Sequence, residues 1–479
     1  MPTLPTKQIE AGPTKAFFVR MLTRDIELAD AILDLLDNCV DGVLRQIAKS
    51  KKRPDAKKPY HGYWAKINLS PDKFEISDNC GGIPEDVAEK SAFMLGRPDR
   101  ERDAGLETVG VYGIGMKRAI FKMGRNCVVT SQPDSGPYKV EITPDWLDQD
   151  GNWTLPLTEI KAKLPEDGTR IVVTDLHETV GRQFDDKTSP FISDLTKEIS
   201  RLYALIIEKG FKVYVNSKKD IQPVDLVILR PKELAKGRGP QIEPYVFVGD
   251  FQGVHVDLAV GFCRPLAKEK EMDDEVLVRR SREQAGWTVM CNDRVVLYND
   301  KTARTGWGTG GVPGYHNQFI SIAGVASFRS TDSMKLPLNT TKRGLDASSE
   351  VYLIALDYMR EGLKKFTSFT NAWKRHEEET DEAFAKLQKG KPTDVSGSIP
   401  SSKFSEIRKH KDQGTGRYYS PDLPRPEEKH PMRRISFAAL EEDIAMVAEY
   451  YFGDRNTDRG VVGKKCFDES LAEAKEQLQ

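Results

Sequence analysis

DLLDNCVDG, residues 34–42, places three carboxylates and one asparagine among Leu, Cys and Val side chains. The surrounding residues 24–47 have the apolar spacing of one long helix. At 100° per residue, the apolar side chains gather on one side, so the helix is amphipathic. The opposite strip is polar and contains Glu27, Asp30, Asp34, Asp37, Asn38 and Asp41.

Two interpretations of this acidic strip remain open. It is either a solvated helix face or a face that meets a cation, because carboxylates one turn apart repel each other and only Arg45 is basic. Asp34 and Asn38 are helical neighbours. A carboxylate can polarise a water molecule, and an amide oxygen can bind Mg²⁺ without adding charge. Mg²⁺ takes few protein ligands when phosphates supply the others.

Composition sets broad limits on the class of protein. A chain of 479 residues has room for two or three domains. The net charge of -1 gives no overall attraction to nucleic acid or acidic membranes. The first residues lack the apolar core of a signal peptide, and no apolar run is long enough to span a bilayer. Six scattered cysteines without a CxxC pair suit reduced thiols. We therefore expect a cytoplasmic protein without membrane contact.

A second segment, ISDNCGGIP at residues 76–84, predicts a strand that ends at Asp78 and runs into a turn. A carboxylate at a strand end can accept a hydrogen bond from an adenine amino group. Gly81 and Gly82 would let a base approach the main chain closely. By itself, however, this pattern is that of a common turn.

A third segment, VGVYGIGMKRA at residues 109–119, predicts a glycine-rich turn followed by a helix. Free amide groups at a helix start attract anions, and Lys117 adds a positive charge in the first turns. The segment is neither a Walker A loop nor a dinucleotide fingerprint. By itself it is weak evidence for a phosphate site.

The order and spacing of these segments, together with DGTRIVVTDL at residues 167–176, resemble the Bergerat ATP-binding fold of the GHKL superfamily. This superfamily includes the ATPase component of DNA gyrase, MutL, MORC proteins, a heat-shock chaperone and histidine kinases, and the likeness is strongest to MutL and MORC. The resemblance covers residues 15–375 and implies an α+β sandwich. It also implies Mg²⁺ and ATP as cofactors.

The resemblance implies a role for each matching residue. Asn38 would hold Mg²⁺, Asp78 would bind the adenine amino group, and Asp34 would activate water. The residues expected to contact nucleotide are Asn38, Asp78, Gly82, Ile83, Gly110, Gly113, Gly115, Lys117 and Thr169. Residues 91–109 would form a lid over ATP.

Three departures from the superfamily pattern affect these expectations, and one of them is Arg118, where relatives often have a small polar residue. Asp34 is one methylene shorter than the usual glutamate, so we expect slow hydrolysis. Cys80 replaces a glycine, and a positive φ there would cost on the order of 1 kcal/mol.

Further along the chain, alternating segments predict a second α/β domain that resembles the ribosomal S5-like transducer domain of these ATPases. LPLNTTKRGLD, residues 336–346, follows its strands. By resemblance, Lys342 is the first candidate to reach the γ-phosphate and Arg343 the second; an ordinary basic loop is the alternative. We expect an ATP-binding domain at 1–190, a transducer-like domain at 191–375, a linker at 376–435 and a helical segment at 436–479.

The expected function is Mg²⁺-dependent ATP hydrolysis that drives a homodimeric clamp, with residues 1–15 as an exchanged arm. The clamp would serve a DNA-acting complex in genome maintenance or phage defence, with a partner protein supplying the effector activity. Residues 45–66 combine basic and aromatic side chains that suit nucleic acid, or they form a solvated loop. A chaperone-like ATPase and a slowly hydrolysing, nucleotide-gated scaffold are the alternatives.

Overall fold

A computed structural model describes residues 14–50, 55, 57–94, 96, 102–110, 113–232, 240–268, 271, 283–339, 342, 344–374, 376–426 and 435–478. The chain divides into two compact units, Met1–Pro426 and Glu427–Gln479. Within the described residues, the first unit contains two seven-stranded sheets and one two-stranded sheet, and the second contains two helices.

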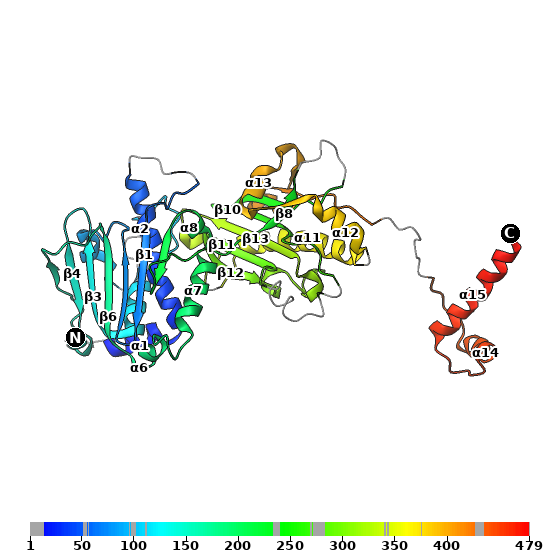
Figure 1. Ribbon diagram of the computed structural model, residues 1–479, viewed down its shortest axis with the longest axis horizontal. Helices are drawn as coiled ribbons and strands as arrows, with labels where there is room; N and C mark the ends of the chain where they lie inside the picture. The colour runs from blue at the N-terminus through cyan, green and yellow to red at the C-terminus, as the bar shows by residue number, and fades with distance from the viewer. Residues whose placement is uncertain are drawn as a thin grey trace, which may run out of the picture. The chain divides into compact units, whose positions relative to one another are not determined.

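The first sheet has the strand order β5-β4-β3-β6-β2-β1-β7 (Figure 1). Its strands are β1 (Trp64–Ser70), β2 (Lys73–Asp78), β3 (Gly124–Gln132), β4 (Tyr138–Ile142), β5 (Leu157–Glu159), β6 (Gly168–Leu176) and β7 (Lys212–Val215). Alternate residues along β1 are buried, as in a sheet with one covered face.

Helices cover that face and complete the first core. The long helix predicted at 24–47 is α2 (Leu28–Lys49), and its apolar side packs with the strands in one cluster. The other helices of this part are α1 (Lys15–Arg24), α3 (Glu85–Val87), α4 (Gly115–Met123), α5 (Pro144–Asp148), α6 (Glu178–Gln183), α7 (Phe191–Leu202) and α8 (Ala204–Glu208). The predicted α+β sandwich is confirmed.

The first domain extends beyond the predicted boundary at residue 190. β7 pairs in parallel with β1, and Ile192, Leu195 and Ile199 of α7 join the first core, as does Ile221. The sequence pattern placed these elements in the second α/β domain. It could not indicate which sheet they would join, because both sheets offer an apolar face.

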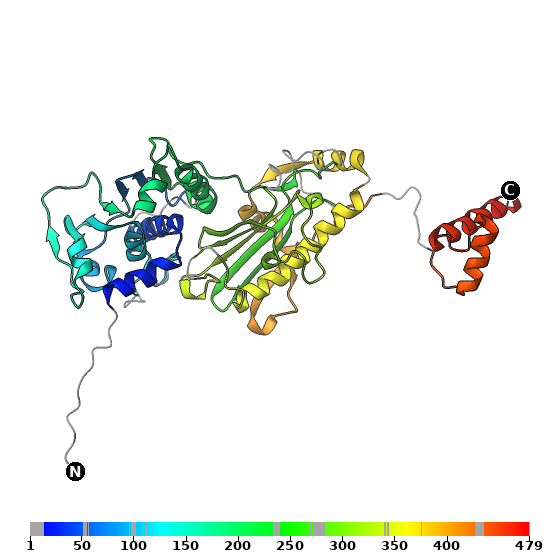
Figure 2. The same cartoon turned by 90° about the horizontal axis from the view of Figure 1, so that it is seen from below.

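The second sheet has the order β12-β11-β13-β10-β9-β16-β15, and α11 (Glu350–Trp373) packs across it (Figure 2). The strands are β9 (Tyr245–Phe251), β10 (Val254–Phe262), β11 (Gly286–Cys291), β12 (Arg294–Asp300), β13 (Ile322–Arg329), β15 (Ser405–Glu406) and β16 (Gly414–Tyr419). The predicted second α/β domain is therefore present.

The linker predicted at 376–435 is wrong for much of its length. β16 pairs with β9 over six residues, and β14 (Leu387–Gly390) pairs with β8 (Ile228–Pro231). Two short helices, α12 (Glu377–Ala385) and α13 (Val395–Ser398), also lie in this segment. An edge strand is held by main-chain hydrogen bonds, so it needs few aliphatic residues and escapes a prediction based on composition.

The second unit contains α14 (Glu441–Phe452) and α15 (Arg459–Gln477), in the segment predicted to be helical. Gly453, at φ 69°, ends α14. Among the helices of the described residues, none combines the length and the apolar character needed to cross a bilayer.

Candidate functional site

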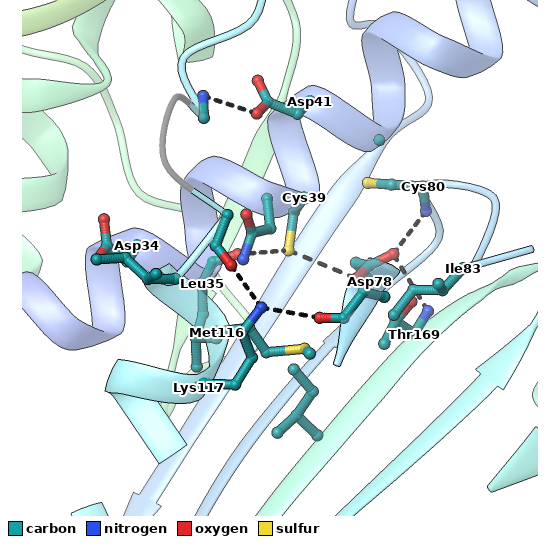
Figure 3. Close-up of a pocket in the computed structure, with 18 of the residues that line it drawn as sticks. Asp34, Leu35, Cys39, Asp41, Asp78, Cys80, Ile83, Met116, Lys117 and Thr169 are labelled. Carbon is teal, nitrogen blue, oxygen red and sulfur yellow. Dashed lines mark hydrogen bonds between the residues drawn. The ribbon is translucent and has the colours of Figure 1, made fainter. Parts of the chain in front are cut away.

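All of the predicted site residues line one pocket of the first unit (Figure 3). The pocket encloses roughly 1370 Å³, part of which is open to solvent. Its walls come from α2, from the turn after β2, from the start of α4 and from β6, while Lys342 enters from the second domain. Segments that lie far apart in the sequence thus meet around one cavity.

Asp78 lies at one side of the pocket and is held by the main chain. One of its oxygens accepts hydrogen bonds from the amides of Cys80 at 2.8 Å and Thr169 at 3.3 Å. The thiol of Cys39 donates to the other oxygen at 3.5 Å. Burial raises the pKa of Asp78, and these hydrogen bonds oppose part of that rise. A methyl group on Gly168 would lie 1.9 Å from the carbonyl oxygen of Asp78, so only glycine allows this approach.

The turn after Asp78 avoids the strain expected at Cys80. The positive φ angles fall on Gly81, at 91°, and Gly82, at 68°, and Cys80 is not among the residues with positive φ. A side chain on Gly82 would lie 2.6 Å from the carbonyl oxygen of Gln132. The cysteine is therefore accommodated without conformational cost, and the glycines carry the turn.

Four carboxylates of the acidic strip, Asp30, Asp34, Asp37 and Asp41, are buried, whereas Asn38 is exposed. The interpretation as a solvated face is therefore wrong for these four residues. Each carboxylate has a partner. The partner of Asp41 is the main chain, because its two oxygens accept from the amides of Val109 and Gly110, each at 2.9 Å.

Asp34 is paired with two cations. Arg118 of α4 donates to one oxygen at 2.5 Å, and the amino group of Lys342 lies 3.3 Å from the other. Lys342 is buried and has a φ of 56°, a conformation that non-glycine residues rarely adopt. Strained residues of this kind gather at functional sites. Arg343, the second candidate, lies outside the described residues.

Asp37 connects three elements. It accepts hydrogen bonds from Tyr203 at 2.6 Å, Arg294 at 3.0 Å and Lys342 at 2.9 Å. Burial by itself would raise the pKa of Asp37, but Lys342, Arg294 and the Tyr203 hydrogen bond lower it to about 2. Burial likewise opposes the charge of Lys342, yet Asp37 and Asp34 hold its pKa above the ordinary value. Both groups are therefore charged at neutral pH.

The sequence did not predict Arg118, Tyr203 or Arg294 as parts of this cluster. Arg118 adjoins Lys117 in the glycine-rich segment, and its Nε is buried without a hydrogen-bond partner in the described part of the chain. That adjacency, and the small polar residue that relatives often have at this position, were the available signals. Tyr203 and Arg294 belong to elements whose approach to α2 depends on the fold.

The glycine-rich segment lies against α2. A methyl group on Gly115 would lie 3.3 Å from Asp34, and Gly113 has a φ of 67°. Lys117 donates to the carbonyl oxygens of Ala92 at 2.9 Å and Gly113 at 2.5 Å. Burial lowers the pKa of Lys117 to about 8. Among the residues that the structure describes, this cation has no carboxylate partner, which suits an incoming anion.

The pocket also fits a nucleotide-borne metal ion. Asn38 presents an exposed amide to the pocket one turn after Asp34. No group of three His, Cys, Asp or Glu side chains suited to a metal occurs within the described residues. A lone amide suits Mg²⁺ that arrives with phosphates, because they supply most of its ligands.

The described part of the predicted lid borders the pocket at Ser91, Ala92, Arg102 and Asp103. Asp103 accepts two hydrogen bonds from Arg45 of α2, at 2.8 and 3.1 Å. Lid residues 95 and 97–101 lie outside the described residues, as do residues 1–13 of the predicted arm.

The basic and aromatic stretch at 45–66 is partly used within the fold. Tyr60 is buried and its hydroxyl lies 3.3 Å from a carboxylate oxygen of Asp293. Trp64 belongs to β1 and donates to Glu166 at 3.3 Å. Both side chains therefore make contacts within the fold, which argues against their use in stacking on nucleic-acid bases. The basic residues 51–53 lie outside the described residues.

Comparison with known proteins supports the resemblance for the first domain. Residues 26–177 match the family described as histidine kinase-, DNA gyrase B-, and HSP90-like ATPase. No curated protein matches the chain. The matched residues include α2, the turn after β2, the glycine-rich segment and β6. Residues 26–177 are therefore similar to the ATPase domain of the GHKL superfamily.

Proposed function

We propose that the chain binds Mg²⁺·ATP in this pocket and hydrolyses it slowly. The observation that carries the proposal is one cavity whose lining includes Asp78 together with Asp34, Lys117 and Lys342. Figure 3 shows Asp34 and Asp78 well apart in this cavity. The base of a nucleotide needs a hydrogen-bond acceptor such as Asp78, and the triphosphate needs cations such as Lys117 and Lys342. One site must supply both.

The Asp78 side suits adenine. A buried carboxylate with fixed orientation accepts a hydrogen bond from an amino group and repels a carbonyl oxygen. Guanine carries a carbonyl where adenine carries its amino group, so ATP should bind more tightly than GTP. Ile76, Ile171 and Met116 line the same pocket and offer apolar surface to a planar base.

The opposite side suits the phosphates. Lys117 is charged at neutral pH and has main-chain partners only, as far as the chain is described. The buried cluster around α2 sets two carboxylates, Asp34 and Asp37, against three cations, Arg118, Arg294 and Lys342. Arg118 and Lys342 of this cluster also line the pocket, where their positive charge favours an incoming γ-phosphate. Mg²⁺ held by Asn38 would neutralise phosphate charge when bound.

Asp34 is the proposed water-activating residue. Its two oxygens are engaged by Arg118 and Lys342, so one of them must be released before the carboxylate can accept a proton from water. A γ-phosphate that draws Lys342 toward itself would supply that release. The requirement for rearrangement and the short Asp side chain both favour slow turnover.

Measurements of ATP turnover separate the proposed roles of Asp34 and Lys342. In single-turnover assays, Asp34→Ala should retain ATP binding and lose hydrolysis by about 100-fold or more, within the range of a general base. Lys342→Met should lose hydrolysis and the ability to distinguish ATP from ADP. If Asp34→Ala hydrolyses ATP at the wild-type rate, another group is the base.

We further propose that hydrolysis switches a homodimeric clamp within a DNA-acting complex. A chaperone-like action on proteins is the alternative. The ion pairs of Asp34 favour a third possibility, a nucleotide-gated scaffold with little turnover. Stimulation of ATPase activity by DNA, lost when Lys57 and Lys58 are neutralised, would support the first. Suppression of client aggregation would support the second, and ATP binding without turnover would support the third.

A further inference from the structure

The turn between β11 and β12 is buried, unlike most hairpin turns, which lie at the surface. Asn292 and Asp293 form it, with φ angles of 47° and 66°, and Cys291 pairs with Arg294. The exposed fractions of Asn292, Asp293 and Arg294 are 2%, 4% and 2%. We call Asn292–Arg294 the hairpin tip. The partners of Asn292 and Arg294 adjoin residues that line the ATP pocket, whereas Asp293 pairs with residues of both domains.

Arg294 connects the hairpin tip to α2. Its Nε donates to Asp37 at 3.0 Å, and its guanidinium lies 4.2 Å from the ring centre of Tyr203. The other oxygen of Asp37 accepts from Lys342 at 2.9 Å. Arg294 and Lys342 are thus fixed by the same carboxylate. Removing Arg294 therefore changes the position and the charge balance that Asp37 imposes on Lys342.

Asn292 connects the hairpin tip to the end of the lid. Its side-chain amide donates to the carbonyl oxygens of Thr108 and Ser330, each at 2.9 Å. The hydroxyl of Ser333 donates to the same Thr108 carbonyl at 2.8 Å. The next two residues, Val109 and Gly110, are held by Asp41 of α2. The lid is therefore anchored from both domains immediately before the glycine-rich segment.

Asp293 fastens the hairpin tip between the two domains. Lys209 donates to one of its oxygens at 2.5 Å, and Tyr60 lies 3.3 Å from the same oxygen. Arg329, at the end of β13, pairs with the other oxygen and also contacts Glu107 of the lid at 3.2 Å. The tip is thus held by both domains and by the lid together.

From these contacts we propose that Asn292 and Arg294 are positioning residues for ATP hydrolysis. Arg294 holds Lys342 in place through Asp37, and Asn292 fixes the lid end through Thr108. The inference rests on the proposed ATPase function and deepens it. Neither residue lines the pocket, so their loss should slow turnover and leave ATP affinity nearly unchanged.

The test compares ATP affinity and single-turnover hydrolysis in full-length variants. Asn292→Gly keeps the positive φ and removes the amide contacts, and turnover should fall about fivefold, the effect of roughly 1 kcal/mol. Arg294→Gln should lose more than tenfold, and Arg294→Lys should recover part of it. The matched control is Gln252→Gly. Gln252 occupies the turn between β9 and β10 with a φ of 53° and donates to Glu350, within its own domain.

A double variant shows whether Arg294 acts through Lys342. Arg294→Gln in a Lys342→Met background should produce little further loss, because the residue being positioned is gone. If the losses of turnover in the two single variants add fully in the double variant, Arg294 does not act through Lys342. Normal turnover in Asn292→Gly and Arg294→Gln, or an equal loss of affinity and turnover, would overturn the inference. If Arg294→Gln does not fold, Asn292→Gly decides. A wild-type protein that neither binds nor hydrolyses ATP would instead defeat the proposed function.

Discussion

Replacing Asp37 with asparagine tests how strongly buried charge joins the two domains. The carboxylate is 1% exposed and serves Tyr203, Arg294 and Lys342 at once. Asparagine offers one oxygen and no charge. In Asp37→Asn, Arg294 loses this carboxylate partner, and Lys342 keeps its ion pair with Asp34 and the charge of nearby Asp41. We therefore expect a lower free energy of unfolding and weaker contact between the domains.

The magnitude follows from the pKa of Asp37. Its folded-state value is about 2, below the ordinary 3.8. A carboxyl with a depressed pKa stabilises the fold fully above its unfolded pKa, and this stabilisation is lost as the pH falls from about 4 toward 2. This lowering of the pKa contributes about 2 kcal/mol to the free energy of unfolding at pH 7. Leaving two buried cations poorly compensated raises the expected cost to about 3–5 kcal/mol.

Urea unfolding followed by circular dichroism measures this cost. The free energy of unfolding of Asp37→Asn should fall furthest below that of the wild type at about pH 5–7. The difference should be smaller by about 1 kcal/mol at about pH 3, because the wild type begins to lose the ion pairs there. The control is Asp194→Asn on α7, whose exposed carboxylate pairs with Lys197 at 3.1 Å. It should unfold nearly as the wild type does. Equal stability of Asp37→Asn and wild type at neutral pH, or a deficit that does not change with pH, would refute the reasoning.

Three further predictions concern the pocket. Gly168→Ala should lower ATP affinity at least tenfold and lower the melting temperature, because its methyl would lie 1.9 Å from the carbonyl oxygen of Asp78. The control is Gly314→Ala, which should change neither quantity because open space surrounds Gly314. A Gly168→Ala variant with wild-type affinity and melting temperature would contradict this packing. ATP affinity should fall as the pH rises above about 8, because Lys117 then loses its proton in the free protein, and calorimetry should show no such fall in Lys117→Met. Iodoacetamide should label Cys466 before Cys80, since burial raises the pKa of the Cys80 thiol; mass spectrometry that finds Cys80 labelled first would argue against this burial.

Local patterns predicted the first domain well because its motifs are short and each depends on its own neighbours. The apolar and polar spacing around Asp34 defines a helix wherever that helix packs. The turn after Asp78 needs glycine for reasons that are visible within a few residues. The site residues predicted in the first domain all line the pocket, and so does Lys342, which was predicted by resemblance rather than from a local pattern.

The partners of the buried acids could not be predicted in this way. Asp37 and Arg294 are 257 positions apart, and only the docking of one sheet edge against α2 brings them together. The acidic strip was expected to meet a bound cation or solvent, and the structure supplies cations from the chain itself. β16 was missed because main-chain pairing along an edge leaves little trace in composition.

The measurement that tests the central claim most directly is nucleotide binding by wild type and Asp78→Asn, with Mg²⁺, by isothermal titration calorimetry. The account predicts that the wild type binds ATP, that it binds GTP more weakly, and that Asp78→Asn loses at least tenfold in ATP affinity with its fold intact. A wild-type protein that does not bind ATP, or an Asp78→Asn variant that binds it equally well, would contradict the account.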